Sequence, residues 1–215
     1  MGISNYAKNK IQDYVFRAQA WSIPANFYVA LIGGAAFPNQ GVAMRSKTYA
    51  VGNYAWPTVP NGRLYKCTVA GTTGASEPSW PTTDGGTVAD GTVTWKEQTP
   101  DLANGTIPEV SGNAYARQML VRSLGTVMGC NLGDSASASS GAGGMVANLA
   151  PIVFPTPTAA WGPVWGVAVF DAASTGNPIF HDQFAIPKIV GEGDPVTIPG
   201  GTANTAYGGL RAALE

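Results

Sequence analysis

The stretch from residue 161 to residue 171, WGPVWGVAVFD, is the most informative part of this sequence about its fold. Two tryptophans four residues apart precede an apolar run, which ends on Asp171 and a turn of small residues, AASTGN. Pro163 has no N–H to donate to a neighbouring strand, so a strand is expected to start directly after it. Such a stretch can be an aromatic ligand platform, the rim of an active site or the middle of a buried sheet.

Periodicity favours the buried sheet. Alternation places Trp165, Val167 and Val169 on one face, and Val164, Gly166, Ala168 and Phe170 on the other. Both faces are apolar, so both are expected to be covered. Trp161 is then expected to pack where the strand begins, Trp165 to lie in the core or at a subunit contact, and Asp171 to begin the turn.

Other segments also read as strands between turn residues. Residues 27–32, FYVALI, predict a central strand covered on both faces. The remaining strand-like runs occupy 64–70, 91–97, 114–124, 152–155, 177–186 and 195–198, although 114–124 also admits a helical reading. Short strands at this spacing predict a β-sandwich or a barrel.

One helix is expected, over residues 4–20. Ser4 can cap it, apolar residues recur at helical spacing, and Pro24 limits its far end. Residues 133–144, GDSASASSGAGG, predict a flexible loop by composition. The expected fold is therefore mainly β: an antiparallel β-sandwich with an N-terminal α-helix and an inserted small β-module.

The composition limits the functions that this chain can have. Charged residues make 12% of the chain, about half the usual fraction, and the net charge is −1. With no basic stripe, nucleic-acid binding has little electrostatic support. No run approaches the roughly 20 apolar residues of a membrane span, and the N-terminus does not resemble a secretory signal. A weakly charged surface favours association, so much of it is expected to be covered by other subunits.

Residues able to carry catalysis are few. The single histidine, His181, has Asp182 beside it but belongs to no recognisable triad motif, and GxSxG, HExxH and P-loop patterns are absent from the sequence. The acidic residues considered as glycosidase carboxylates are Asp134, Asp171, Asp182, Glu192 and Asp194, most of which stand beside Gly, Ala or Pro, as turn residues do. Cys67 and Cys130 are too few for a disulfide framework or a zinc site and are expected to be small buried residues. No catalytic residue, cofactor or metal site is therefore expected.

Aromatic residues are the better candidates for ligand contact. Tryptophan and tyrosine are concentrated in residues 47–98, where exposed rings could stack on the apolar faces of sugars. The alternative is that the rings form the core of a small module. Trp80, between Pro78 and Pro81, is the best candidate. The full set of candidate glycan or partner contacts is Trp56, Tyr65, Trp80 and Trp95.

Four blocks of the sequence resemble, in their order and spacing, a widespread family of tailed-bacteriophage virion proteins described as tail-fibre or minor tail proteins. The blocks are SNYAKNKIQDYVF with PANFYVALI, PEVSGNAYARQ at 108–118, residues 152–177, and IPKIVGEGDPVTIPGG at 186–201. The segment NGRLYKCTVAGTTGASEPSWPTTDGGTVADGTVTWKEQ resembles the small carbohydrate-binding-type β-modules found inserted in phage structural proteins. This pair of resemblances implies a virion β-sandwich domain of residues 1–40 and 101–215, interrupted by a module of residues 41–100.

The resemblance implies a structural or adhesion role without catalysis. The expected protein is a virion component of the tail, baseplate or fibre apparatus, assembled in the host cytoplasm as a homo-oligomer, with a trimer favoured. Its expected partners are other virion proteins and a host-surface glycan contacted by the module, with no nucleic acid and no membrane insertion. A capsid-associated decoration or head-fibre protein is the alternative, and a glycan depolymerase is a third reading.

Overall fold

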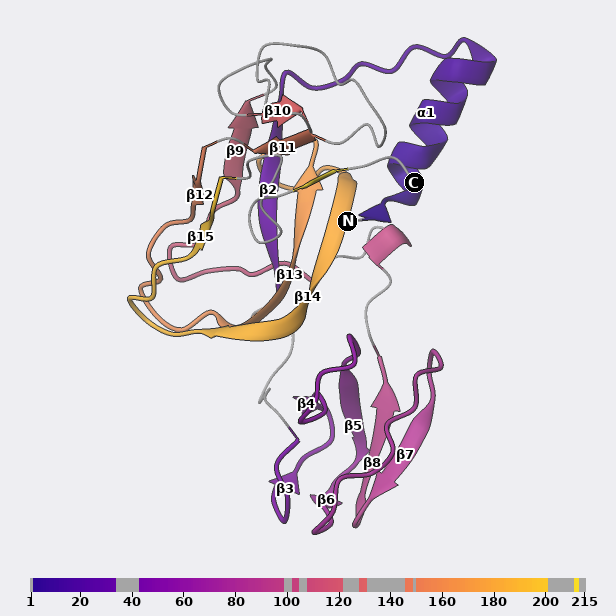
Figure 1. The fold of residues 1–215 in the computed structure, drawn as a ribbon, viewed down its shortest axis with the longest axis vertical. Helices are drawn as coiled ribbons and strands as arrows, with labels where there is room; N and C mark the ends of the chain where they lie inside the picture. Colours follow the sequence, from indigo (N-terminus) through magenta and orange to yellow (C-terminus); the bar gives the residue numbers. More distant parts are fainter. Residues whose placement is uncertain are drawn as a thin grey trace.

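The computed structural model describes residues 2–33, 43–98, 102–104, 108–121, 128–130, 146–148, 150–200 and 211–212. Strands dominate these residues, every strand pair is antiparallel, and one α-helix lies near the N-terminus (Figure 1). The predicted fold class, mainly β with an N-terminal helix, is confirmed.

A five-stranded sheet forms the larger part of the molecule. Its strands are β1 (Gly2–Ile3), β14 (Pro178–Val190), β13 (Gly162–Phe170), β2 (Asn26–Gly33) and β9 (Gln118–Val121), in that spatial order. The strand predicted around residues 163–171 is therefore the middle one, and the strand predicted at 27–32 lies beside it. Residues 163–170 are all buried, as expected for a strand covered on both faces.

The register of β13 corrects one prediction. Val164 pairs with Gly33 and Gly166 pairs with Ile32, so Trp165 is an extra residue opposite β2, which is a β-bulge. The extra residue reverses the alternation. Val164, Val167 and Val169 consequently share one apolar cluster, whereas Trp165, Ala168 and Phe170 share another. The predicted grouping of Trp165 with Val167 and Val169 is wrong, because strict alternation ignores the bulge.

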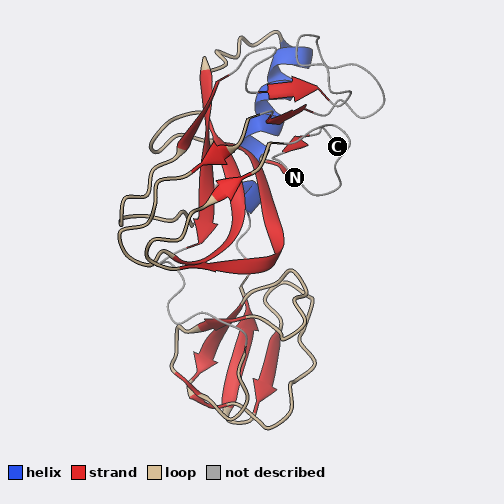
Figure 2. Cartoon of the chain, turned by 60° about the vertical axis from the view of Figure 1, so that its left-hand side comes forward, coloured by secondary structure: helices blue, strands red, loops and turns tan. Residues whose placement is uncertain are grey.

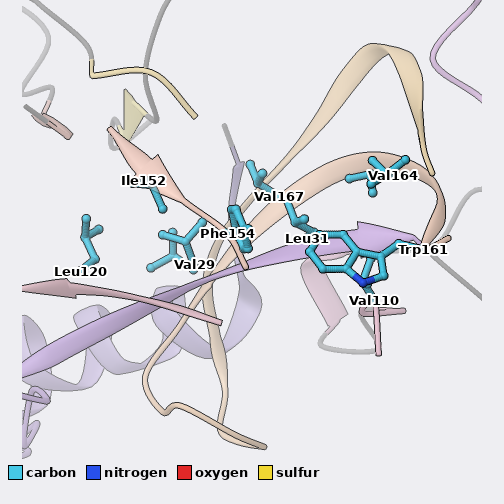
Figure 3. Close-up of a cluster of buried hydrophobic side chains, with 11 residues drawn as sticks. Val29, Leu31, Val110, Leu120, Ile152, Phe154, Trp161, Val164 and Val167 are labelled. Carbon is cyan, nitrogen blue, oxygen red and sulfur yellow. The ribbon is translucent and has the colours of Figure 1, made fainter. Parts of the chain in front are cut away.

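The first of these clusters is the core of the larger part. Strands β12 (Ile152–Val153) and β15 (Thr197–Ile198) pair with each other, and Ile152 packs in this core with Phe154 (Figure 3). Trp161 is buried there at the start of β13, as predicted, and its indole N–H donates to the Asn113 carbonyl at 3.0 Å. The buried residues of this cluster are Val29, Leu31, Val110, Leu120, Ile152, Phe154, Trp161, Val164, Val167, Val169 and Val190.

The predicted helix is α1, Asn5–Arg17. The Ser4 side chain accepts a hydrogen bond from the Ala7 N–H at 3.1 Å, which confirms the predicted cap. Ala7 is buried against Ile179 of β14. The helix ends three residues earlier than predicted, because Ala18 takes a left-handed conformation with φ 51°.

Residues 43–98, which we call the inserted module, form separate sheets at one end of the molecule (Figures 1 and 2). Its four-stranded sheet has the order β4 (Tyr54–Ala55), β5 (Tyr65–Val69), β8 (Val93–Glu97) and β7 (Thr87–Asp90). Strands β3 (Thr48–Tyr49) and β6 (Gly71–Thr72) form a second, two-stranded sheet. The predicted strands at 64–70 and 91–97 are confirmed as β5 and β8.

An apolar cluster joins the module to the five-stranded sheet. Trp56 and Leu64 of the module belong to the same cluster as Ile32, Trp165 and Phe170. Leu102, in the short 3₁₀ helix η2 (Leu102–Asn104), is buried with them. Trp165 thus lies in the core, where it meets the module.

The structure describes only part of the segments for which the other strands, the loop and the cysteines were predicted. A third sheet contains β10 (Met128–Cys130), β11 (Val146–Asn148) and β16 (Arg211–Ala212). Of the predicted strand 114–124, the structure describes residues 114–121, where β9 is the strand, while the loop predicted at 133–144 and the side chain of Cys130 lie outside the described residues. Cys67 is buried and free, as predicted. Among the residues described, no helix is long and apolar enough to cross a membrane.

Candidate functional site

The aromatic residues of the module form a packed cluster. The ring of Trp95 lies edge-on to Tyr49, with centroids 4.9 Å apart. Trp80 lies 4.4 Å from Tyr65 and 5.9 Å from Trp95, centroid to centroid. Tyr65 and Trp95 are both 0% exposed. These two rings are the core of the module and present no surface to a ligand.

Trp80 occupies a different position, because it is only half-buried. One part of its ring packs on Tyr65, and its indole N–H donates to Glu77 Oε1 at 2.9 Å. The Tyr65 hydroxyl donates to the carbonyl of Pro81 at 2.7 Å, which ties the loop next to Trp80 to the core. Trp80 is therefore held in place from beneath, as a ring that contacts a ligand should be.

Glu77 carries the charge next to this ring. Burial raises the pKa of its carboxyl, but hydrogen bonds from the Thr58 N–H and the Trp80 indole outweigh burial and bring the pKa below its usual value. Glu77 is consequently a carboxylate at neutral pH, and its Oε1 accepts from the edge of the Trp80 ring.

The four predicted contact residues do not form one surface. Trp56 is only 6% exposed and belongs to the cluster between module and sheet, apart from Tyr65 and Trp95. Of the four, Trp80 is the residue with accessible ring surface. Glycan contact by the module stays a prediction, and it now depends on Trp80.

An ion pair with a buried carboxylate lies within the module, between Arg45 and Asp90. Arg45 Nη1 donates to both oxygens of Asp90, at 2.8 and 3.0 Å, and the Asp90 side chain is 1% exposed. Asp90 also accepts from the Gly74 N–H at 2.9 Å and from the Trp95 indole at 3.2 Å. Asp90 belongs to no sequence motif, and its position before Gly91 is typical of a turn.

The block PEVSGNAYARQ contains a second buried ion pair. Arg117 donates to Glu109 from Nε and Nη2, and to the carbonyls of Ala172 and Thr175 from Nη1 at 2.7 Å. The Tyr115 hydroxyl donates to Glu109 at 2.9 Å. Burial, followed by the charge of Glu109, raises the pKa of Tyr115 far above its usual value. This network joins residues 109–117 to the turn after β13.

Asp171 and Asp194, two of the acidic residues considered for catalysis, hold turns, whereas Asp182 lies within strand β14. Asp171 accepts from the Asn177 N–H at 2.6 Å and from its side-chain amide at 3.0 Å. Asp194 accepts from the Gly191 N–H at 2.7 Å. Asp182 accepts from the Gln183 N–H at 3.0 Å, and Asp134 lies outside the described residues. Within the described part of the chain, no group of three or more His, Cys, Asp or Glu side chains is placed to hold a metal ion.

A mainly antiparallel β fold with an N-terminal helix, in which ion pairs tie loops and turns together, defines the chain as a β-rich protein. Comparison with known protein families then identifies which family the chain belongs to. The model of the family described as podophage GP4 fiber I protein gp80 matches residues 95–205, which is 111 of the 215 residues. The chain therefore belongs to this family of phage fibre proteins. No curated protein matches the sequence significantly.

The region that matches the family covers the second half of the chain and little of the inserted module. It starts at Trp95 in β8 and contains strands β9, β12, β13, β14 and β15. A fibre protein of this family is a structural component of the virion and interacts with other virion components, as the resemblance implied. The match leaves out residues 1–94, and with them almost all of the inserted module.

Proposed function

We propose that this chain is a non-enzymatic subunit of the tail, baseplate or fibre apparatus of a tailed phage. The observation that carries the proposal is the match to a phage fibre family over residues 95–205, which contain strands β9, β13 and β14 of the larger sheet. The ion pairs of the chain also support a structural role. Arg117 and Asp90 form hydrogen bonds that hold neighbouring loops in place.

The proposed subunit has two parts. The virion β-sandwich domain takes residues 1–40 and 101–215, and the stretch 41–100 contains the inserted module described above. The division is supported by the sheets, since the module's strands all fall between Thr48 and Glu97 and pair only with one another. The module's position at one end of the molecule suits an outward-facing role (Figure 2).

The subunit assembles as a homo-oligomer, with a trimer favoured. Apolar side chains at the end of α1 support association, since Tyr14, Val15 and Phe16 are 62, 60 and 81% exposed. Light scattering on the purified chain tests this part. We expect the mass of a trimer and, for Phe16→Asp, a shift toward the monomer, whereas Lys8→Asp on the same helix leaves the mass unchanged.

The module contacts a host-surface glycan through Trp80. The contact is weak at a single site, and several copies on one particle supply avidity. A glycan array with the wild-type chain and Trp80→Ala tests the contact: we expect binding that the substitution removes. Release of reducing sugar from host polysaccharide would instead identify an enzyme.

Localisation on the particle is the decisive experiment. Cryo-electron microscopy of virions bearing an antibody fragment against the module should show density on the tail or its fibres. Density on the head shell would overturn the proposed placement and favour a capsid decoration or head-fibre protein.

A further inference from the structure

A polar cleft of about 850 Å³ lies where the inserted module meets the five-stranded sheet. We call it the module–sheet cleft. Its lining comes from segments far apart in the sequence. The module supplies Asn61, Arg63, Asp84, Lys96 and Glu97, and β14 supplies His181, Asp182 and Gln183. A volume of this size falls within the range of roughly 300–1,000 Å³ that ligand sites occupy.

Ion pairs and hydrogen bonds connect the residues of the module wall of the cleft. Arg63 Nη1 lies 2.6 Å from Asp84 Oδ1 and 3.2 Å from Glu97 Oε1, and the Glu97 side chain is only 4% exposed. The other oxygen of Glu97 accepts from the Gly85 N–H at 2.9 Å. Asn61 donates to the Tyr65 hydroxyl at 2.8 Å, which ties the loop to the aromatic core. The buried Glu97 and its partner Arg63 are held in this way and need little ordering when a ligand binds.

The opposite wall is part of a long strand. His181 pairs with Gly2 on one side and with Ala168 on the other, and Gln183 pairs with Gly166. Trp165, which the β-bulge turns toward the module, packs with Trp56 close to Gln183. The contact between Trp165 and Trp56 holds the module wall close to the β14 wall. Because the bulge in β13 places Trp165 in this contact, it contributes to the shape of the cleft.

The charges of the lining limit the class of ligand. Arg63 and Lys96 are positive, and Asp84, Glu97 and Asp182 are negative, so the lining is close to neutral with a slight negative excess. A polyanion such as a nucleic acid or an acidic polysaccharide is disfavoured there. The amide of Asn61 is engaged within the module, since it donates to the Tyr65 hydroxyl and accepts from the Arg63 N–H. Gln183 on the β14 wall carries an amide donor and an amide acceptor, and Lys96 on the module wall carries an ammonium donor. Polar groups of this kind on both walls suit a ligand that carries many hydroxyl groups.

We infer that the module–sheet cleft binds a short segment of a neutral host-surface polysaccharide between the module and β14. This inference rests on the proposed host contact, but it concerns a site other than Trp80. Lys96, which is exposed on β8, and Gln183 on β14 donate hydrogen bonds to sugar hydroxyls from the two walls.

The test is a glycan array with neutral and acidic oligosaccharides, followed by calorimetric titration of the neutral oligosaccharide that binds best. The full chain is compared with Lys96→Ala, Gln183→Ala and Trp80→Ala. Lys188→Ala and Gln118→Ala are matched controls, because both side chains lie on the same sheet but outside the cleft. We expect each cleft variant to weaken binding about tenfold, as the loss of a hydrogen bond to a ligand does, and both controls to bind as the wild type does.

The outcomes separate the two sites. Loss of binding in Trp80→Ala with unchanged binding in both cleft variants would overturn the cleft and leave the host contact at Trp80 in place. A preference for acidic glycans, or no glycan binding at all, would also overturn the cleft, and neither result affects the structural role on the virion. An altered oligomeric mass in the cleft variants would identify the cleft as a subunit interface instead. Circular dichroism of each variant checks that the fold is intact.

Discussion

Arg117 holds Glu109 by two hydrogen bonds, from Nε to Oε1 at 2.9 Å and from Nη2 to Oε2 at 2.7 Å. The Arg117 side chain is 7% exposed, and its guanidinium carbon lies 3.7 Å from the centroid of the Phe170 ring. The same guanidinium reaches the carbonyls of Ala172 and Thr175. One side chain therefore ties a loop before β9 to the turn after β13.

Replacing Arg117 by methionine should destabilise the protein strongly. The substitution leaves Glu109 without its counter-charge and two carbonyls without a donor, and removing one partner of a buried pair costs about 3 kcal/mol or more. Urea unfolding measures the change. Arg17→Met is the control, because Arg17 pairs with Asp13 on the helix surface at 73% exposure and should contribute under about 1 kcal/mol. Equal losses in the two variants would contradict a special role for Arg117.

Gly166→Ala should destabilise the central strand. A Cβ at this position would lie 2.4 Å from the Asp182 carbonyl oxygen, which belongs to the backbone of β14 and cannot move aside alone. We expect a loss of more than about 2 kcal/mol in chemical denaturation. Gly112→Ala is the comparison, since its Cβ would meet nothing within 4 Å and only its positive φ of 71° opposes alanine. Its expected cost is about 1 kcal/mol.

Stability should fall at alkaline pH, partly because of Tyr115. Burial and the charge of Glu109 raise the pKa of Tyr115 above that of an unfolded tyrosine, which is about 10. Below that value both states keep the proton and the contribution is complete. Above it the unfolded chain releases the proton and the native state retains it, so the free energy of unfolding decreases as pH rises.

Denaturant unfolding between about pH 8 and pH 11 tests the role of Tyr115. The decrease with pH should be smaller for Tyr115→Phe than for the wild type. Tyr14→Phe, at a tyrosine that is 62% exposed, should keep the wild-type dependence. Identical pH dependence in Tyr115→Phe and the wild type would show that Tyr115 makes no contribution.

Cys67 should be unreactive in the native protein. Its side chain is 0% exposed, its thiol lies 3.2 Å from the Val69 carbonyl, and burial raises its pKa, so little thiolate forms. In a Cys130→Ser variant, where Cys67 is the remaining thiol, a disulfide reagent should react at least about a hundredfold more slowly than in urea. Fast modification of the folded variant would contradict the burial.

Local pattern was sufficient to locate most of the elements. The uniformly apolar FYVALI and the alternating TVTWK are β2 and β8, and the cap at Ser4 starts α1. These signals depend on neighbours within a few residues, so they can be read directly from the chain. The end of α1 was less well predicted, because the left-handed conformation of Ala18 has no glycine to signal it.

The candidate site was predicted less well than the fold. Composition indicated an aromatic module, but it could not say which rings face the core. Tyr65 and Trp95 turned out to be buried and Trp80 half-buried, because packing across β5 and β8 decides exposure. Arg63 and Gln183 carry no motif, and the cleft that they line forms between the module and β14, from segments far apart in the sequence.

For WGPVWGVAVFD, the sequence by itself determined a strand covered on both faces, since apolar residues at every position leave no face for water. Only the tertiary structure decided which side Trp165 takes. Pairing with β2 inserts one residue between Val164 and Gly166 and sends the indole toward the module, because register is set by the neighbouring strand and not by the strand's own alternation.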